Sequence, residues 1–393
     1  MQQKHNTWRQ NMKHYISWIL FLMGSVIGAG FFGLPQVVHD VGIIPSIAII
    51  TGVGILAVII HLLLAEVSLS LPGNKNIIDL GRALFPKNLI IIHTRVAIFQ
   101  FFFGILIYVI LAGWFIQTIW HAVGIEIHHA RATCLYVGLI GRISLRKLET
   151  SITIDTVVVG VLISCILLIA MAALWQWEYI LSELPRTASP RLLYSIALLS
   201  FIGINAIPLL HTFTGNNIKR TTSIISASGI LVTSLAIIFA LAVISLSGTF
   251  TSANVTDGLM LSRHQTRAIL ASIMWLAAII SSHIPVLEHL LDIFVSDAHT
   301  TRIRGRWILT LLPVLIYLYF DPDFISLLGN VGGILSGLLA MLVCLLNIRL
   351  HTTKQKVHTI SMLPYDHIWS WIVFCVCGLG VLYTIFHIFA LST

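Results

Sequence analysis

The fold is decided by one stretch of the first apolar segment, which reads GSVIGAGFFGLP from residue 24 to residue 35. Inside a helix each glycine costs about 1 kcal/mol and a proline about 3 kcal/mol, and Pro35 also leaves the carbonyl of Phe31 without its helical partner. The stretch therefore predicts a helix that is interrupted near its middle. The alternative is close helix packing, because Gly24 and Gly28 form a GxxxG pair that lets membrane helices approach one another.

A second segment carries a similar interruption, which reads SFIGINAIP from residue 200 to residue 208. Both stretches contain the pattern Ser-x-Ile-Gly, starting at Ser25 and at Ser200, and Pro208 frees the carbonyl of Ile204. Paired interruptions in corresponding helices of two halves indicate a transporter site, since half-helix N-termini bind anions and unwound carbonyls bind cations. The pair favours two broken helices around one binding site.

Charged residues are rare in this chain. They number 38 of 393 residues, or 10% (23 Lys+Arg and 15 Asp+Glu), while 57% of the residues are hydrophobic and the mean hydropathy is +0.95. Soluble domains carry about 25% charged residues, and no water-soluble fold can bury so much apolar side chain. The chain is therefore an integral membrane protein, which excludes soluble enzymes, nucleic-acid binders and disordered chains. The five cysteines lie in apolar stretches without a framework spacing, which excludes a disulfide scaffold.

Apolar segments of about 20 residues predict eleven membrane-spanning helices. Their expected ranges are 15–38, 43–70, 92–122, 130–145, 152–176, 192–213, 221–248, 266–294, 306–320, 323–348 and 368–391. The fourth and the ninth are the shortest. A short interfacial helix is expected at 76–84, because apolar and charged residues alternate there before Pro86 ends the helix.

Ten of the eleven expected helices divide into two units of five. Five helices separate the two interruptions, so we expect two repeats of five helices, at 15–176 and at 192–348. An odd number of spans inverts the second repeat relative to the first. A segment at 1–14 precedes the repeats, and one extra helix at 368–391 follows them. The expected fold class is an all-α polytopic membrane protein.

Basic residues lie mostly on one side of the expected helices. The N-terminal segment and the even-numbered loops hold 18 of the 23 Lys and Arg residues, and the opposite side holds Arg131, Arg186, Arg191, Arg263 and Arg267. Since loops rich in Lys and Arg stay in the cytoplasm, we expect a cytoplasmic N-terminus and an external C-terminus. The basic excess is then a topology signal and not a nucleic-acid surface. The first segment lacks a cleavage site and acts as a signal anchor, and the short loops indicate a bacterial inner membrane.

Several short motifs resemble one family when they are taken in order. Besides the two interruptions they are Ala65-Glu66, Tyr108 with Ala112-Gly113, Arg146-Lys147-Leu148-Glu149, Gly215-Asn216, and Ser281-Ser282 with Asp292. The chain is similar to the amino acid/polyamine/organocation superfamily, and most to its proton-coupled aromatic amino acid permeases and amino acid/auxin permeases. It departs from the aromatic permeases at Ile204-Asn205, where those proteins tend to carry a bulkier side chain, so the identity of the neutral amino acid stays open.

The resemblance implies a LeuT-type fold with alternating access to a central site. It implies that amides of the first interruption bind the substrate carboxylate and that carbonyls of both interruptions bind the amine. The implied substrate-binding residues are Ile27, Gly28, Ala29, Gly30, Tyr108, Ile202, Gly203, Asn205 and Ala206. Sodium-binding members hold the cation between carbonyls of the first helix and hydroxyls of the eighth, which here correspond to Gly24, Ile27, Ser281 and Ser282.

Acidic residues are candidates for proton coupling. Four fall inside the expected helices, namely Glu66, Asp155, Glu288 and Asp292. An ionised acid at mid-bilayer costs about 2.5–3.5 kcal/mol, so each needs a partner, a proton or a position close to cytoplasmic water. Glu288 and Asp292 stand four residues apart and repel one another unless one is protonated. We expect proton coupling at Glu288, Asp292 and Glu66, and the alternative for each is that it simply reaches the cytoplasm.

These patterns predict a secondary active transporter that imports a neutral amino acid, with aromatic amino acids among the candidates, by proton symport. Its partners are the amino acid, the coupling proton and the lipid bilayer. The histidines within or beside the helices, His61, His211 and His283, either shuttle protons or pack as neutral rings. Sodium symport, a channel and a transporter-like sensor remain alternatives. An enzyme is not expected, because neither GxSxG nor HExxH occurs, and the sequence indicates no cofactor and no resident metal.

Overall fold

The computed structural model describes most of the chain. The described residues are 2–71, 73, 76–144, 152–174, 188–215, 217–251, 253, 255–256, 265–298, 301–352, 361–364 and 366–392. Almost all of them are helical, and no strand occurs among them. The motif Arg146–Glu149, Asn216 and the side chain of Asp155 lie outside the described residues. The prediction of an all-α protein is confirmed.

The described helices follow one another along the chain with these bounds. They are α1 (Gln2–Val26), η1 (Ala29–Gly33), α2 (Leu34–Val41), α3 (Ile43–Ser70), α4 (Ile77–Leu84), α5 (Lys87–Ala122), α6 (His129–Ser144), α7 (Ile152–Ala173), α8 (Pro190–Phe201), η3 (Ile204–Ala206), η4 (Pro208–Leu210), α9 (His211–Thr214), α10 (Ile218–Ser247), η5 (Gly248–Phe250), α12 (Gln265–Ala298), α13 (Arg302–Phe320), α14 (Phe324–Asn330), η6 (Val331–Ser336), α15 (Gly337–Thr352) and α16 (Asp366–Ser392). Here η6 is a π-helical segment and the other η elements are 3-10 helices.

Nine of the described helices are long and apolar enough to cross a membrane, and the bent pair His14–Val26 and Ala29–Val41 gives a tenth. The remaining predicted span, 130–145, is α6, which has 16 residues. Several helices begin earlier than predicted, and among those after the first span the largest shifts are those of α5, which begins at Lys87, and α13, which begins at Arg302. Their first turns carry basic residues, whose long side chains reach water while the helix continues into the apolar layer. The structure therefore contains the expected eleven helical units.

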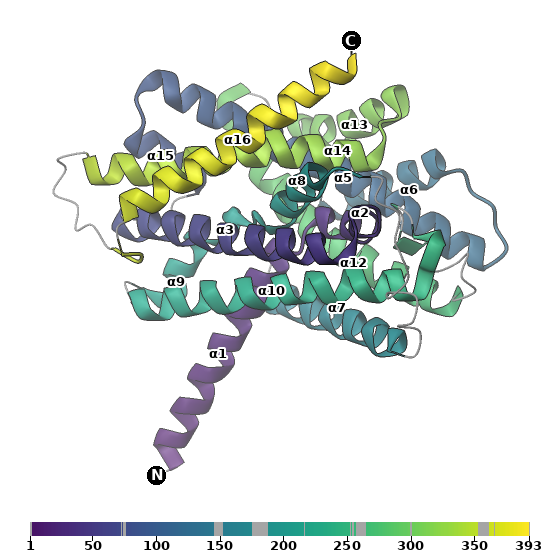
Figure 1. Ribbon diagram of the computed structural model, residues 1–393, viewed down its shortest axis with the longest axis horizontal. Coiled ribbons are helices and arrows are strands. Elements are labelled where there is room, and N and C mark those ends of the chain that lie inside the picture. The colour runs from purple at the N-terminus through teal and green to yellow at the C-terminus, as the bar shows by residue number, and fades with distance from the viewer. Residues whose placement is uncertain are drawn as a thin grey trace.

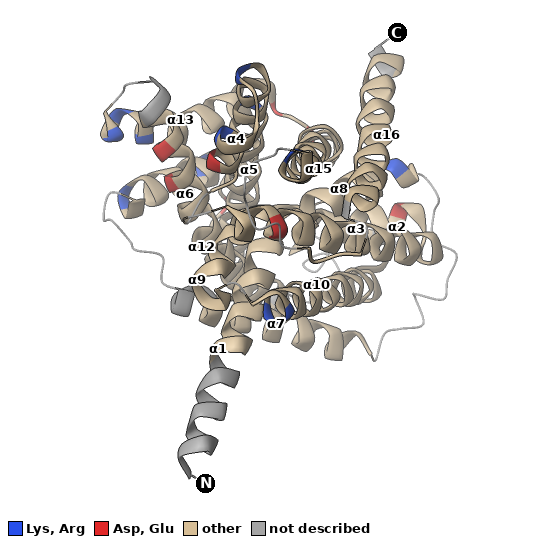
Figure 2. Cartoon of the chain, turned by 90° about the vertical axis from the view of Figure 1, so that its left-hand side faces the viewer, with Lys and Arg blue, Asp and Glu red and all other residues tan. Residues whose placement is uncertain are grey.

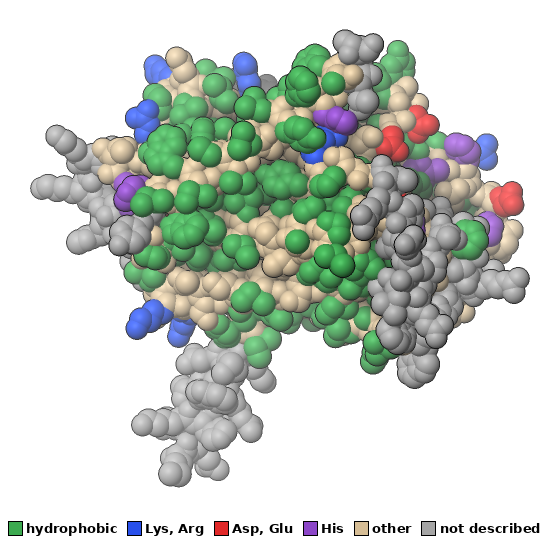
Figure 3. Space-filling view, in the orientation of Figure 1, with side chains coloured by type: hydrophobic (Ala, Val, Ile, Leu, Met, Phe, Trp, Pro, Cys, Tyr) green, Lys and Arg blue, Asp and Glu red, His purple; other side chains and the backbone are tan. Residues whose placement is uncertain are grey.

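The helices pack side by side into one bundle, in which α10 lies between α3 and α7 and α5 contacts α6 and α12 (Figure 1). Charged residues occur at only a few places along the described helices (Figure 2). Hydrophobic side chains cover much of the visible described face (Figure 3). Large apolar residues such as Ile44, Leu315 and Phe386 are exposed on the surface of the bundle. Such a surface is stable only against lipid, as the composition predicts.

The first interruption is a break between α1 and η1. The amide of Gly28 donates to the carbonyl of Val26 at 2.7 Å, and Gly28 is extended, with φ −95° and ψ −170°. Helical structure resumes in η1 and then α2, where Pro35 lies in the first turn and needs no amide partner. The two parts of the span meet at an angle of 63°. The prediction of a broken helix is confirmed.

The second interruption breaks the sixth span after Phe201. Two short 3-10 helices, η3 and η4, follow before the single turn of α9, and Pro208 begins η4. Gly215 ends this span with φ +54°, a left-handed conformation that glycine adopts at little cost. The sixth span therefore consists of four short pieces.

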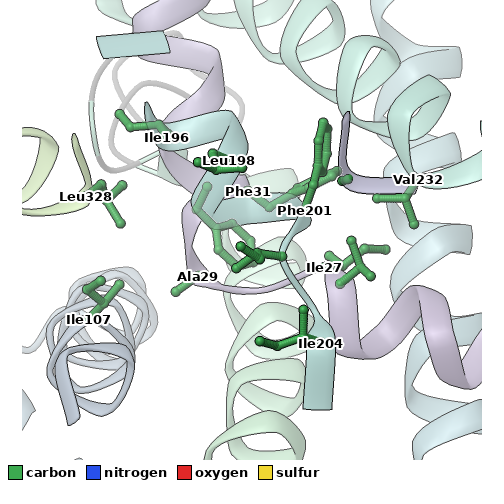
Figure 4. Packing of buried hydrophobic residues seen from close by; sticks show 14 of the residues in the cluster. Ile27, Ala29, Phe31, Ile107, Ile196, Leu198, Phe201, Ile204, Val232 and Leu328 are labelled. Atoms are coloured by element: carbon green, nitrogen blue, oxygen red, sulfur yellow. The ribbon is translucent and has the colours of Figure 1, made fainter. Parts of the chain in front are cut away.

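The two breaks lie against one another (Figure 4). A Cβ on Gly203 would lie 2.7 Å from the carbonyl oxygen of Ser25, and a Cβ on Gly30 would lie 2.7 Å from Ser200 Oγ. The hydroxyl of Ser25 donates to the carbonyl of Leu22 at 3.0 Å and reaches that of Gly203 at 3.4 Å. These glycines thus serve both of the roles considered, because they break the helices and also let them approach.

Candidate transport site

A cavity of about 710 Å³ lies beside the two breaks. Pockets for small molecules usually measure about 300–1,000 Å³. The wall from the first span consists of Trp18, Phe21, Gly24, Ser25 and Ile27, and the wall from the second break consists of Asn205, Ala206, Pro208, Leu209 and Thr212. Both broken spans therefore contribute backbone and side chains to one space.

Three further helices and α4 complete the cavity. The wall from α12 consists of Ala278, Ser281, Ser282, Pro285, Val286 and His289. The other walls are Tyr108 from α5, Val158, Val159 and Leu162 from α7, and Asn76, Ile77 and Asp79 at the start of α4. Most of this lining is apolar, and the polar groups are few and separate, as in sites that bind an amphiphilic small molecule.

The cavity reaches the side of the bundle that the basic residues assign to the cytoplasm. Asn76, which caps α4 by accepting from the amide of Asp79 at 2.9 Å, is exposed. The Asp79 carboxylate is partly exposed and pairs with Arg82 at 3.4 Å. The prediction of a short helix at 76–84 is confirmed, and α4 forms part of the exposed mouth of the cavity. With the expected topology, this mouth faces the cytoplasm.

Buried aromatic rings pack on one another beyond the cavity in a cluster that we call the outer aromatic layer and that comprises Phe31, Phe32, Phe115, Phe239 and Trp275. The ring of Phe32 lies 5.3 Å from Trp275 and 5.5 Å from Phe115, and Phe31 stacks on Phe239 at 5.1 Å. All five side chains are at most 4% exposed. Trp275 stands one turn before the cavity residue Ala278 on α12. With the expected topology, the layer lies on the outer side of the cavity.

The polar centre of the cavity lies where Tyr108 meets the first break. A Cβ on Gly28 would lie 3.7 Å from Tyr108 Oη, so this hydroxyl faces the extended backbone of the break. The hydroxyl also interacts with the side chain of Ser282 on α12. The neighbouring hydroxyl of Ser281 donates to the carbonyl of Ala278 at 2.9 Å and keeps its acceptor lone pairs.

The structure brings seven predicted site residues to one cavity. They are Gly24, Ile27, Tyr108, Asn205, Ala206, Ser281 and Ser282. The others at the breaks, Gly28, Ala29, Gly30, Ile202 and Gly203, are not among the described lining residues. Gly30 and Gly203 pack against the backbone of the opposite break, which accounts for their small size without a ligand.

The predicted coupling acids lie away from the cavity. The carboxylate of Glu288 accepts from Arg302 and Arg306 at 2.6 Å each, and Asp292 accepts from Arg302 at 2.6 Å. The two acids therefore share Arg302, whose positive charge offsets the repulsion that the sequence suggested. Glu66 is fully buried where α3, α15 and the loop before α16 meet. There it bonds His351 Nε2 at 2.6 Å and the amide of Met362 at 3.3 Å.

Several lining residues were not predicted from the sequence. From the sequence alone, Trp18 and Phe21 are interpreted as residues that face lipid or pack between helices. The cavity residues of α7 lie in an apolar run without a distinguishing feature. His289 could have been predicted from the sequence, because it stands seven residues after Ser282 and thus lies on the same helix face. The same spacing places Ala278 and Pro285 on that face.

The arrangement of the helices is that of LeuT-type transporters. The chain is similar to the solved structure of MhsT in complex with L-phenylalanine, with 14% identity, a TM-score of 0.66, and coverage of 94% of this chain and 98% of that one. It is also similar to the Eremococcus coleocola manganese transporter, with 13% identity, a TM-score of 0.67, and coverage of 97% and 87%. The inward facing conformation of Mhp1 gives 14% identity, a TM-score of 0.66, and coverage of 96% and 91%.

The sequence itself identifies the family. The sequence model of the tryptophan/tyrosine permease family matches residues 12–383, and the chain belongs to this family. No curated protein sequence matches the chain. The expected likeness to aromatic amino acid permeases agrees with this family. The protein is a multi-pass membrane transporter, as its helices and its family both indicate.

Proposed function

We propose that the protein is a secondary active transporter that imports an aromatic amino acid, tryptophan or tyrosine first, together with a proton. The observation that carries the proposal is the large cavity beside two touching helix breaks, with the outer aromatic layer packed one turn of α12 beyond it. The family description supports an aromatic substrate, and the bound L-phenylalanine of MhsT supports this class of ligand for the fold.

In this proposal the substrate carboxylate lies at the first break. The amides of Ala29 and Gly30 stand where a half-helix begins, a place that favours negative charge, whereas the amide of Gly28 already donates to Val26. The ammonium group then meets carbonyls of the second break, between Ile202 and Ala206. Tyr108 Oη lies beside the first break and can donate to the carboxylate.

The aromatic ring of the substrate then lies in the apolar part of the cavity. Val158, Val159 and Leu162 on α7 line this cavity together with Trp18 and Phe21 on the first span. Burying an aromatic ring against such a wall is favourable by the hydrophobic effect and by ring contacts. The proposed substrate therefore matches the cavity at both its polar and its apolar end.

Transport requires a second conformation that opens the outer aromatic layer and closes the cytoplasmic mouth. In the proposed cycle, residues 15–176 and 192–348 act as the two inverted repeats. Residues 1–14 stay in the cytoplasm. The helix at 368–391 belongs to neither repeat and takes no part in the conformational change. A bacterial inner membrane is the proposed location, because proton symport there is driven by the proton gradient. Each break lies in the first helix of its repeat, and the two breaks touch, so they can change together.

Sodium symport is the second candidate. The four residues that the resemblance implies for sodium, Gly24, Ile27, Ser281 and Ser282, all line the same cavity. Carbonyl and hydroxyl oxygens are suitable ligands for a hard cation. This observation favours sodium as the alternative to the proton and determines the design of the experiment.

The test is uptake into proteoliposomes. Purified protein is reconstituted, and accumulation of labelled tryptophan, tyrosine and alanine is followed under a proton gradient, a sodium gradient or neither. We expect tryptophan or tyrosine to accumulate above equilibrium under the proton gradient, and the accumulation to collapse when a protonophore is added. Accumulation under sodium alone would support the second candidate. Linear, non-saturating flux would indicate a channel, and absence of flux in folded protein would indicate a sensor.

A further inference from the structure

His283 on α12 lies between two tyrosine rings behind the cavity. Its Nδ1 is 2.9 Å from the hydroxyl of Tyr136 on α6, and its ring stacks on Tyr108 of α5, with centroids 5.9 Å apart and 28° between the planes. His283 and Tyr136 are both 0% exposed, whereas Tyr108 lines the cavity. One side chain therefore separates His283 from the proposed substrate.

The second nitrogen of His283 is the unusual feature. His283 Nε2 is buried and has no hydrogen-bond partner among the described residues. If Nδ1–H donates to Tyr136, then Nε2 is a free lone pair that can accept a proton. If Tyr136 donates instead, Nε2–H is a buried donor without an acceptor. Leaving a buried polar atom unpaired is unfavourable in either tautomer, and such groups persist where function requires them.

The surroundings of His283 hold no compensating charge. Tyr108 and Tyr136 are the titratable side chains that face it, from α5 and α6. Within the described residues no carboxylate, lysine or arginine hydrogen-bonds to it from α7 or α13, which also pack against α12. Glu288, the acid that follows on α12 itself, is paired with Arg302 and Arg306. A positive ring is therefore unfavourable in this inward-open conformation.

We propose that His283 takes up the coupling proton on Nε2 and that Tyr108 transmits its charge to the substrate. This inference rests on the proposed function, because it names the residue through which the proton acts. A protonated ring behind Tyr108 attracts the phenol face and favours a carboxylate at the first break. Binding of the proton and binding of the substrate then strengthen one another to the same degree.

The described conformation corresponds to the release step. Here the burial of His283 and the lack of an acidic partner among the described residues favour loss of the proton. Without the positive charge of the ring, the substrate carboxylate is bound more weakly at the first break. The cavity is open to the cytoplasm, so both ligands leave on that side. His283 acts through Tyr108 and is a positioning residue rather than a direct contact of the substrate.

Other buried histidines lack this connection. His61 on α3 also has an unpartnered Nε2 and is 3% exposed, but it lines a separate small space beside Val58 and Ser228. His93 on α5 packs against Gly81 and Phe85 on α4. His289 lines the cavity and its buried Nε2 is also unpartnered among the described residues, but its ring contacts Phe101 and not Tyr108. His61 therefore provides a matched control of equal burial.

The test compares His283→Gln with His61→Gln in proteoliposomes. A gradient of about two pH units allows about a hundredfold accumulation for one proton per substrate, since each pH unit is a factor of ten. We expect wild type and His61→Gln to accumulate tryptophan under this gradient. His283→Gln should equilibrate it without accumulation, while exchange of labelled for unlabelled substrate continues and its affinity no longer changes with pH.

The outcomes separate this inference from the function on which it rests. Equal accumulation and an equal pH profile in His283→Gln and wild type would overturn the role of His283 alone. A wild type that does not accumulate substrate under the proton gradient would contradict the proposed function itself. If His283→Gln does not fold, Tyr136→Phe replaces it, because this change removes only the hydroxyl at Nδ1. It should shift the pH midpoint of substrate binding, and an unchanged midpoint overturns the inference.

Discussion

Gly30→Ala tests whether the two helix breaks must touch. The added Cβ would lie 2.7 Å from Ser200 Oγ, 3.1 Å from the Ser200 amide nitrogen and 3.3 Å from the carbonyl oxygen of Ile196. The hydroxyl of Ser200 is held by its bond to that carbonyl at 2.7 Å, and the other two atoms are backbone. The clash can therefore be relieved only by moving α8 away from the first break. Overpacking of this kind costs about 1–3 kcal/mol.

The measurement is thermal unfolding of purified protein, followed by the fluorescence of its ten tryptophans, together with uptake kinetics. One kcal/mol corresponds to about 2–4 °C in Tm for a domain of 150–250 residues and to less in a longer chain. We expect Gly30→Ala to lower Tm by several degrees and to reduce the maximal uptake rate, because the separated breaks no longer form one site.

Gly28→Ala is the matched control two residues away. Its Cβ would meet Tyr108 Oη at 3.7 Å and the carbonyl oxygen of Val26 at 3.9 Å, which are ordinary contacts, and its φ of −95° suits alanine. The variant should unfold at the wild-type Tm but bind substrate more weakly, because the methyl group stands beside Tyr108. Wild-type stability and uptake in Gly30→Ala, or an equal loss of Tm in both variants, would refute the packing argument.

Three further predictions concern polar side chains. Tyr108→Phe should raise the KM for the amino acid about fivefold, the equivalent of one hydrogen bond of about 1 kcal/mol, with Tm unchanged; an unchanged KM would remove Tyr108 from the substrate site. Asp292→Asn should retain proton-driven accumulation, because its carboxylate is 61% exposed and pairs with Arg302 away from the cavity; loss of accumulation would restore its coupling role. Glu66→Gln should lower Tm, since a charge-assisted bond to His351 contributes about 1.5–3 kcal/mol, while the accumulation ratio stays the same; a changed ratio would implicate Glu66 in coupling.

The helices and their breaks follow from local sequence. Apolar length gives the spans, and the glycines with Pro35 and Pro208 give the two breaks, because these effects act within a few residues. The π-helical segment Val331–Ser336 was not predicted. It depends on tertiary packing, since Gly332 lies against the carbonyl of Ser195 on α8, and no single residue in the segment requires the wider turn.

The candidate site was predictable only in part, for a similar reason. Its backbone elements were expected from the two breaks, and Tyr108, Ser281 and Ser282 came from the resemblance. The partners of charged groups were not predictable, because they join residues far apart in the chain. Glu66 and His351 are separated by 285 residues, and no pattern within either helix indicates the other.

The outer aromatic layer also has an electrical consequence. Water in a cavity open to the cytoplasm lies at the potential of the cytoplasm, so the voltage across the membrane falls over the closed layer formed by Phe32, Phe115 and Trp275 with their neighbours. Each elementary charge that crosses this layer changes the free energy by about 2.3 kcal/mol per 100 mV. Ligand exchange with the cytoplasm is therefore insensitive to voltage. The membrane potential acts instead on the conformational step that opens these rings.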